Sequence, residues 1–328
     1  MHTIRQLPVI RKKWGYPYRL WITQEFDDLG WNLVEQSRRQ GRIHDVTLFI
    51  EDPQGRFALM SKHSYPPGIF RSPSGGVHLH EPFDQGAIRE AKEETGLNIQ
   101  LQSFVLHITL EITHQEDSIT WESYIFHATT HQTRLQPVDL KEVREAIWVD
   151  PTQMHLMIQK LKNTENGGLI YRANLTEAFL WSLQNPFKLE SADIYQIPIY
   201  EKIKSKIKSP ELLEKTFFFN ASIQHLWAGC IGITLHPNFY ELSILEIHSS
   251  FYGRGLAQAL TTYIVDQWNF KQNQFAEKKD LWVFSQYPAY FIPLHFHLPE
   301  DLSMTPPFIL SEINKKPARS VALKYTPF

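Results

Sequence analysis

Hydrophobic and polar positions along the first half of the chain predict short strands followed by helices. Apolar runs and alternating positions predict strands at 45–50, 56–60, 100–113, 120–128 and 146–149, with a turn at 52–55 that joins the first two as a hairpin. Helical spacing predicts helices over 82–95, 151–162 and 171–184. This mixture of elements indicates an α/β or α+β fold.

The second half repeats this kind of pattern with different spacing. Strands are predicted at 216–219, 226–234, 241–247 and 281–285, and a helix at 255–269. A chain of 328 residues is long enough for two domains. We therefore expect an aromatic-rich lead-in at 1–41 that packs on the first domain, a first domain at 42–184, a linker at 185–199 and a second domain at 200–328.

Composition narrows the class of protein. Apolar residues make up 42% of the chain and charged residues 21%, which is typical of a soluble globular protein. The 33 Lys and Arg residues nearly balance the 35 Asp and Glu residues, so there is no strong nucleic-acid footprint. The single cysteine, Cys230, excludes an intramolecular disulfide and indicates a reducing, cytoplasmic compartment. The chain lacks an apolar run of about 18 residues, so we expect neither a membrane segment nor a signal peptide.

The segment 75–97 carries the candidate chemistry and reads GGVHLHEPFDQGAIREAKEETGL. On a helix, Glu90, Glu93 and Glu94 share one face, and Arg89 can partly neutralise or orient them. Three crowded carboxylates need a compensating charge, and a hard cation such as Mg²⁺ or Mn²⁺ binds both carboxylate and phosphate oxygens. The alternative is a solvated acidic helix face. We also expect Ala87, Ile88 and Ala91 to point toward a core.

Residues before this helix are candidates for substrate binding. Gly75 and Gly76 allow a close approach to the backbone, and Arg71 can hold a phosphate. None of these residues specifies which compound is bound.

The segment 75–97 resembles a complete Nudix box, with Gly75, Glu81, Arg89-Glu90-Ala91, Glu93-Glu94 and Gly96-Leu97 at the required spacing. The resemblance covers roughly 42–165. It implies an α/β/α sandwich that hydrolyses a nucleoside diphosphate linked to another group.

By motif position, the resemblance implies that Glu90, Glu93 and Glu94 are metal ligands, that Glu81 is an outer or additional ligand, and that Arg89 holds the glutamates in place. The general base varies in this family, and the candidates are Glu94 and two acids on a later loop, Glu142 and Glu145. The implied partner is a small nucleoside diphosphate derivative, and the sequence specifies no oligomeric state.

A segment of the second half resembles another family. A predicted strand runs into Gly253-Arg254-Gly255 and then into a helix, a pattern similar to the acyl-coenzyme A loop of GNAT-type N-acetyltransferases. Ser250 stands where that loop has Arg or Gln. The resemblance implies a mixed-sheet α/β domain that holds acetyl-CoA. The sequence thus predicts a Nudix hydrolase with a GNAT-like domain; the alternatives are a bifunctional protein with acyltransferase activity and a nucleotide-sensing protein.

Overall fold

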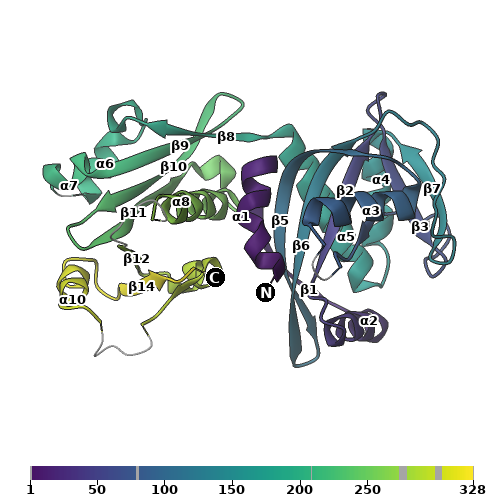
Figure 1. The fold of residues 1–328 in the computed structure, drawn as a ribbon, viewed down its shortest axis with the longest axis horizontal. Coiled ribbons are helices and arrows are strands. Elements are labelled where there is room, and N and C mark those ends of the chain that lie inside the picture. Colours follow the sequence, from purple (N-terminus) through teal and green to yellow (C-terminus); the bar gives the residue numbers. More distant parts are fainter. Residues whose placement is uncertain (1, 79–80, 208, 273–278, 300–304, 328) are drawn as a thin grey trace. The chain divides into compact units, whose positions relative to one another are not determined.

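The computed structural model describes residues 2–78, 81–207, 209–272, 279–299 and 305–327, and it divides the chain into two compact units (Figure 1). The first unit is Met1–Gln184 and the second is Asn185–Phe328. Each unit is built on its own mixed β-sheet, which confirms the expected α/β fold class of both halves.

The sheet of the first unit has the order β1-β5-β6-β2-β3-β7, with β4 paired to β2. Its parallel pairs are β1 with β5 and β2 with β6, and the other pairs are antiparallel. The strands are β1 (Tyr18–Glu25), β2 (His44–Glu51), β3 (Phe57–Lys62), β4 (Ser74–Gly75), β5 (Gln100–His114), β6 (Asp117–Thr129) and β7 (Val143–Val149).

Helices cover both faces of this sheet, because alternate residues of its strands are apolar toward each face. On one face, Val46, Leu48 and Ile50 of β2 pack in a core with the helices α1 (His2–Trp14) and α3 (Phe83–Thr95). On the other face, Phe49 stacks on Phe179 of α5 (Gly167–Gln184), with ring centroids 3.7 Å apart. The helix α4 (Pro151–Lys162) packs against α5. The result is three layers.

The lead-in at 1–41 folds into regular elements of the first unit. It contains α1, β1 and α2 (Asp28–Arg39), and β1 pairs with β5 through eight residue pairs from Tyr18↔Leu106 to Glu25↔Thr113. Asp27 caps α2 by accepting a hydrogen bond from the Gly30 N–H at 2.9 Å. The lead-in therefore extends the sheet as well as packing on it.

The sheet of the second unit has the order β13-β14-β12-β11-β10-β9-β8. The segment expected as a linker, 185–199, contributes β8 (Phe187–Ala192), which pairs with β9 along six residue pairs. The remaining strands are β9 (Thr216–Ile223), β10 (Leu226–Leu235), β11 (Phe239–Ile247), β12 (Asp280–Ser285), β13 (Phe296–His297) and β14 (Val321–Tyr325).

Short helices surround this second sheet, and one long helix connects its parallel strands. The long helix is α8 (Leu256–Gln272), which follows β11 and precedes β12. The short helices are α6 (Tyr200–Lys206), α7 (Pro210–Glu214), α9 (Pro288–Phe291) and α10 (Pro307–Ile313), with 3₁₀ turns η1 (Ile194–Gln196), η2 (Ser249–Phe251) and η3 (Ile292–Leu294). Within the described ranges, no helix is long and apolar enough to cross a membrane.

Candidate functional site

The helix expected from the acidic motif is α3, and its end explains one motif glycine. Gly96 follows α3 with φ +77°, a left-handed conformation that favours glycine. A Cβ there would lie 2.0 Å from the carbonyl oxygen of Gln136. Ala87 and Ala91 are buried as expected, but Ile88 is 43% exposed and does not reach the core.

Arg89 organises the acidic residues of the motif. Its guanidinium donates to both carboxylate oxygens of Glu81 at 3.0 Å, to Glu90 at 2.8 Å and to Glu93 at 3.0 Å. It also donates to the carbonyl oxygen of Gly76 at 2.7 Å. Burial disfavours this charge, but Glu81 and Glu90 outweigh burial and raise the pKa of Arg89. One cation thus fixes three glutamates and the preceding loop.

The two glycines before the helix leave room for these side chains. A Cβ at Gly75 would lie 1.9 Å from Oε2 of Glu90, and a Cβ at Gly76 would lie 2.7 Å from the Arg42 side chain. A larger residue at either position would therefore require the Glu90 carboxylate or the Arg42 side chain to move.

Among the motif carboxylates, Glu90 has a strongly raised pKa. Burial raises its pKa to about 7, and the bonds from Arg89 only partly counter this, while Glu94 and Glu93 raise it further. Glu93 is more exposed, at 42% of its side chain. Among the described residues, no three His, Cys, Asp or Glu side chains are already placed so that they could bind one metal ion together. In this conformation Arg89 holds the carboxylates that the motif assigns to a metal.

Glu94 faces a different environment. It is buried and accepts a hydrogen bond from the Ser74 N–H at 2.7 Å, and its other oxygen lies 3.4 Å from Nη2 of Arg71. The Lys62 ammonium lies 3.9 Å from the same oxygen. Because Glu94 is part of a buried ion pair, its substitution is expected to affect stability as well as chemistry.

Arg71 is also buried, and its guanidinium makes four hydrogen bonds with its five N–H groups, including the one to Glu94. It donates to the Tyr65 hydroxyl at 2.9 Å, to the Ser72 carbonyl at 2.7 Å and to the Ser74 hydroxyl at 2.9 Å. Burial opposes ionisation of the Tyr65 phenol, but Arg71 and Lys62 outweigh it and lower its pKa. Arg71 therefore positions the loop around Glu94, and any contact with a phosphate would add to these bonds.

The structure separates the two later acids. Glu142 contacts Lys62 and lines a cavity of the first unit. Glu145 instead pairs with Arg144 at 3.6 Å and does not line that cavity. Glu94, Lys62 and Glu142 thus form a chain of alternating charge at the cavity.

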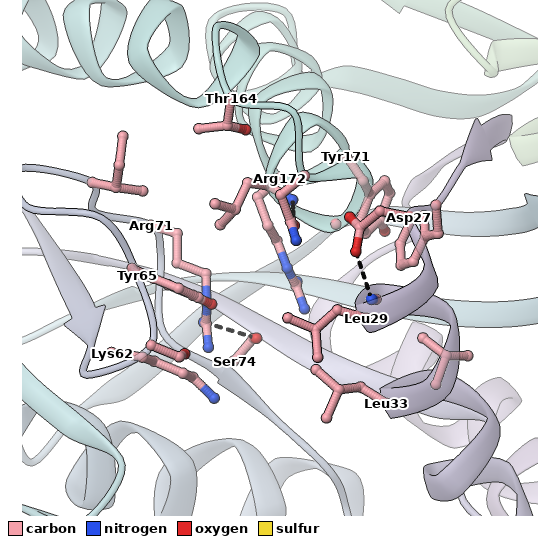
Figure 2. Close-up of a pocket in the computed structure, with 18 of the residues that line it drawn as sticks. Asp27, Leu29, Leu33, Lys62, Tyr65, Arg71, Ser74, Thr164, Tyr171 and Arg172 are labelled. Atoms are coloured by element: carbon pink, nitrogen blue, oxygen red, sulfur yellow. Dashed lines mark hydrogen bonds between the residues drawn. The ribbon is translucent and has the colours of Figure 1, made fainter.

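A large cavity, about 1640 Å³, opens beside this chain of charges. Arg71, Ser74 and Lys62 line one side of it, and the start of α5 lines another (Figure 2). The sheet contributes Leu110, Ile112 and Trp121, and α2 contributes apolar residues that include Leu29 and Leu33.

Sequence reasoning missed the contributions of α2, Asp45, Tyr171 and Arg172 to this cavity. Asp45 and Arg172 lie 127 residues apart in the sequence and meet in an ion pair at 2.7 Å. The available signal for α2 was local: Asp27 is a favourable N-cap, and Gly41 follows the helix. No local signal marks the other residues as neighbours.

In the second unit, the residues of the expected acyl-coenzyme A loop form a turn before α8. Gly253 has φ +71° and Gly255 has φ +79°, so both glycines adopt the left-handed conformation. A Cβ at Gly253 would meet nothing within 4 Å, so backbone conformation explains this glycine better than steric exclusion does. Arg254 lies between the two glycines.

Comparisons with known proteins find one family model that matches part of the first unit. Residues 41–172 match the family model described as the NUDIX domain. No curated protein matches the chain significantly. Among solved structures, a MutT protein from Methanosarcina mazei Go1 is 20% identical with a TM-score of 0.33, and the match covers 44% of this chain and 96% of that one.

Two other solved structures are similar to parts of the chain. An Ap4A hydrolase from C. elegans is 23% identical with a TM-score of 0.29, and the match covers 42% of this chain and 98% of that one. An N-acetylglutamate synthase from Neisseria gonorrhoeae is 13% identical with a TM-score of 0.33, and the match covers 42% of this chain but 34% of the synthase. The family model matches residues 41–172 alone, and these solved structures show similarity of fold only.

We predict that Arg71→Met lowers the free energy of unfolding by about 3 kcal/mol, because it leaves the Glu94 carboxylate buried without its guanidinium partner. Arg71→Met combined with Glu94→Gln should lose less than the two single variants together. Chemical denaturation of the four proteins measures this coupling.

Arg39→Met is the matched control, because Arg39 is exposed and its ion pair with Glu35 contributes at most about 1 kcal/mol. If the stability losses of Arg71→Met and Glu94→Gln simply add in the double variant, the proposed coupling between the two buried residues is contradicted.

Proposed function

We propose that the first unit is a metal-dependent pyrophosphohydrolase of the Nudix type, because residues 41–172 match the NUDIX domain model. Its substrate is a nucleoside diphosphate linked to another group, and water attacks at phosphorus. The observation that carries this proposal is the Arg89 guanidinium, which binds Glu81, Glu90, Glu93 and the Gly76 carbonyl at once. A helix face that is only solvated would not require this network.

The chemistry of the donor set fits Mg²⁺ or Mn²⁺. Glu90, Glu93 and Glu94 are carboxylates on one helix, and hard divalent cations prefer such oxygen ligands. These three residues would hold the ion, and Glu81 would support them through Arg89. A bound ion of this type lowers the pKa of a water molecule and offsets the charge that develops on phosphorus.

The remaining groups of the site have separate tasks in this proposal. Arg71 and the Ser74 N–H hold the Glu94 side chain in place. Glu142 acts as the general base, because it lines the cavity while Glu145 does not. Lys62 contacts Glu142 and lines the same cavity, and in this proposal its ammonium also attracts a phosphate oxygen of the substrate.

We predict that the full chain hydrolyses at least one nucleoside diphosphate derivative only with Mg²⁺ or Mn²⁺, and that chelation abolishes turnover. Glu93→Gln should reduce kcat at least ~10²-fold, because positioning and neutralisation by a metal supply several kcal/mol of the barrier reduction. Glu93 is the sharpest variant because its side chain is partly exposed, so stability should change little.

The control is Glu177→Gln, which removes an exposed partner of Lys162 in the same unit and should keep the wild-type rate. Activity would be measured with nucleotide sugars, dinucleotides, coenzyme A species and nucleoside triphosphates. Metal-independent turnover, or a wild-type rate for Glu93→Gln, would contradict the proposed chemistry.

We predict that Glu142→Gln lowers kcat by about 10²-fold with little change in KM, as expected when a general base is removed. Glu145→Gln is the matched control, because Glu145 has similar exposure three residues away but pairs with Arg144. Steady-state kinetics of both variants separate the two acids. If both variants lower kcat equally, or if Glu145→Gln lowers it more, Glu142 is not the general base.

A second function is favoured by the sheet of the second unit: binding of an acyl-coenzyme A. The parallel strands β11 and β12 pair only from Phe239↔Asp280 to Glu241↔Trp282, although β11 continues to Ile247. Beyond Glu241, β11 is therefore unpaired on its β12 side, and the Gly253-Arg254-Gly255 turn then leads into α8. We propose that this unpaired edge and the turn bind the pyrophosphate and pantetheine portions of the ligand.

We predict that the full chain binds coenzyme A with a Kd of about 10 µM, and that Arg254→Gln weakens binding about tenfold, the effect of losing one charge-assisted hydrogen bond. Lys215→Gln, an exposed lysine of the same unit that pairs with Glu211, should have no effect. Calorimetry provides the measurement. No heat at near-millimolar coenzyme A from folded protein would contradict a ligand site in this unit.

A further inference from the structure

The apolar floor of the large cavity contains one buried polar network. Asp45 on β2 accepts hydrogen bonds from the Ser123 hydroxyl at 2.6 Å and from Nη2 of Arg172 at 2.7 Å. Nη1 of Arg172 donates to the Thr47 hydroxyl at 2.8 Å. A buried ion pair contributes little net stability, so its position in a cavity wall points to recognition of a ligand.

This network leaves hydrogen-bond donors available toward the cavity. Tyr171 is buried and lines the cavity; its hydroxyl makes no hydrogen bond of ordinary geometry among the described residues, and the neighbouring Ser123 hydroxyl, which lowers its pKa slightly against the effect of burial, already donates to Asp45. The guanidinium of Arg172 lies 5.5 Å from the Tyr171 ring centroid, and two of its five N–H groups suffice for the bonds to Thr47 and Asp45. Burial raises the pKa of Tyr171, so its phenol stays protonated and can donate.

Each carboxylate oxygen beside these donors already accepts a hydrogen bond. Both oxygens of Asp45 accept hydrogen bonds, and those of Asp27 accept from the N–H groups of Gly30 at 2.9 Å and Gly167 at 3.3 Å. A ligand amino group that approached Arg172 would meet a guanidinium, which cannot accept a hydrogen bond. Beside Arg172, the wall therefore matches a ligand edge that carries acceptors.

The opposite wall suits a flat apolar ring. Leu29 and Leu33 of α2 are 66% and 58% exposed although they line the cavity, and Leu110 and Trp121 of the sheet also line it. Figure 2 shows both leucines projecting from α2, with Tyr171 and Arg172 on α5. The α2 leucines lie outside residues 41–172, so this part of the wall comes from the lead-in, whereas Leu110 and Trp121 belong to the matched segment.

We propose that this cavity binds the base of the substrate, and that the base is a 6-oxopurine such as guanine. The O6 and N7 atoms of this base form a pair of adjacent acceptors, which an arginine can bind in a bidentate manner, whereas adenine presents an amino group beside N7. The Tyr171 hydroxyl and Arg172 donate to that edge, and Leu29 and Leu33 cover the ring. This inference rests on the proposed function for the position of the diphosphate, which Lys62 and the α3 glutamates would approach.

Calorimetry of the full chain with GDP, ADP and UDP in Mg²⁺ tests the inference without requiring turnover. GDP should bind at least about tenfold more tightly than ADP or UDP, which corresponds to one or two hydrogen bonds gained or left unpaired. Tyr171→Phe should weaken GDP binding about tenfold and ADP binding much less, so that the ratio narrows. Leu33→Ser should weaken both nucleotides and keep the ratio.

Tyr124→Phe is the matched control, because Tyr124 is equally buried but lies on the opposite face of the sheet beside Phe83. ADP or UDP binding as tightly as GDP would overturn the inference, as would an unchanged ratio in Tyr171→Phe. If the protein hydrolyses nucleotide derivatives but shows no preference among bases, the inference about guanine is wrong and the proposed hydrolase function still stands. Selective GDP binding without hydrolysis of any nucleotide derivative would instead overturn the proposed function.

Discussion

One guanidinium determines the arrangement around which the first unit is organised. Carboxylates that share a helix face repel each other, and burial makes the repulsion stronger. Arg89 compensates for this by binding Glu81, Glu90 and Glu93, and its bond to Gly76 ties the loop to the same point. At Gly75 the Glu90 side chain of this network occupies the space where a Cβ would lie. The spacing of the motif is therefore a consequence of how one planar cation reaches its partners.

Much of this arrangement could be predicted from the sequence, because the interactions are local. Arg89 and Glu93 are four residues apart on one helix, so helical periodicity brings them together, whereas Glu81 precedes the helix and is placed by the loop. The strands were also predictable, since most carry short apolar runs bounded by turn residues. Even here Ile88 was misplaced: its position in the pattern suggested the core, but it lies at the edge of the buried face and remains exposed.

Other features could not be predicted, because they depend on contacts between distant segments. The pairing of Asp45 with Arg172 requires β2 and α5 to be placed by the whole sheet. The lead-in has a readable alternation at Tyr18, Leu20 and Ile22, but only its parallel pairing with β5 shows that it is a strand of the first sheet. Likewise, Asn185-Pro186 suggested a linker, whereas strand pairing with β9 makes the next residues part of the second sheet.

The position of β1 has a consequence for where this domain can be cut. β1 is the outermost strand beside β5, and it covers eight residues of that strand's backbone. A fragment started at residue 41, where the family match begins, would leave these N–H and C=O groups of β5 without partners. An exposed long strand edge recruits other chains, so such a fragment would self-associate into extended sheets. The working unit of this protein is therefore larger than its recognisable homologous segment.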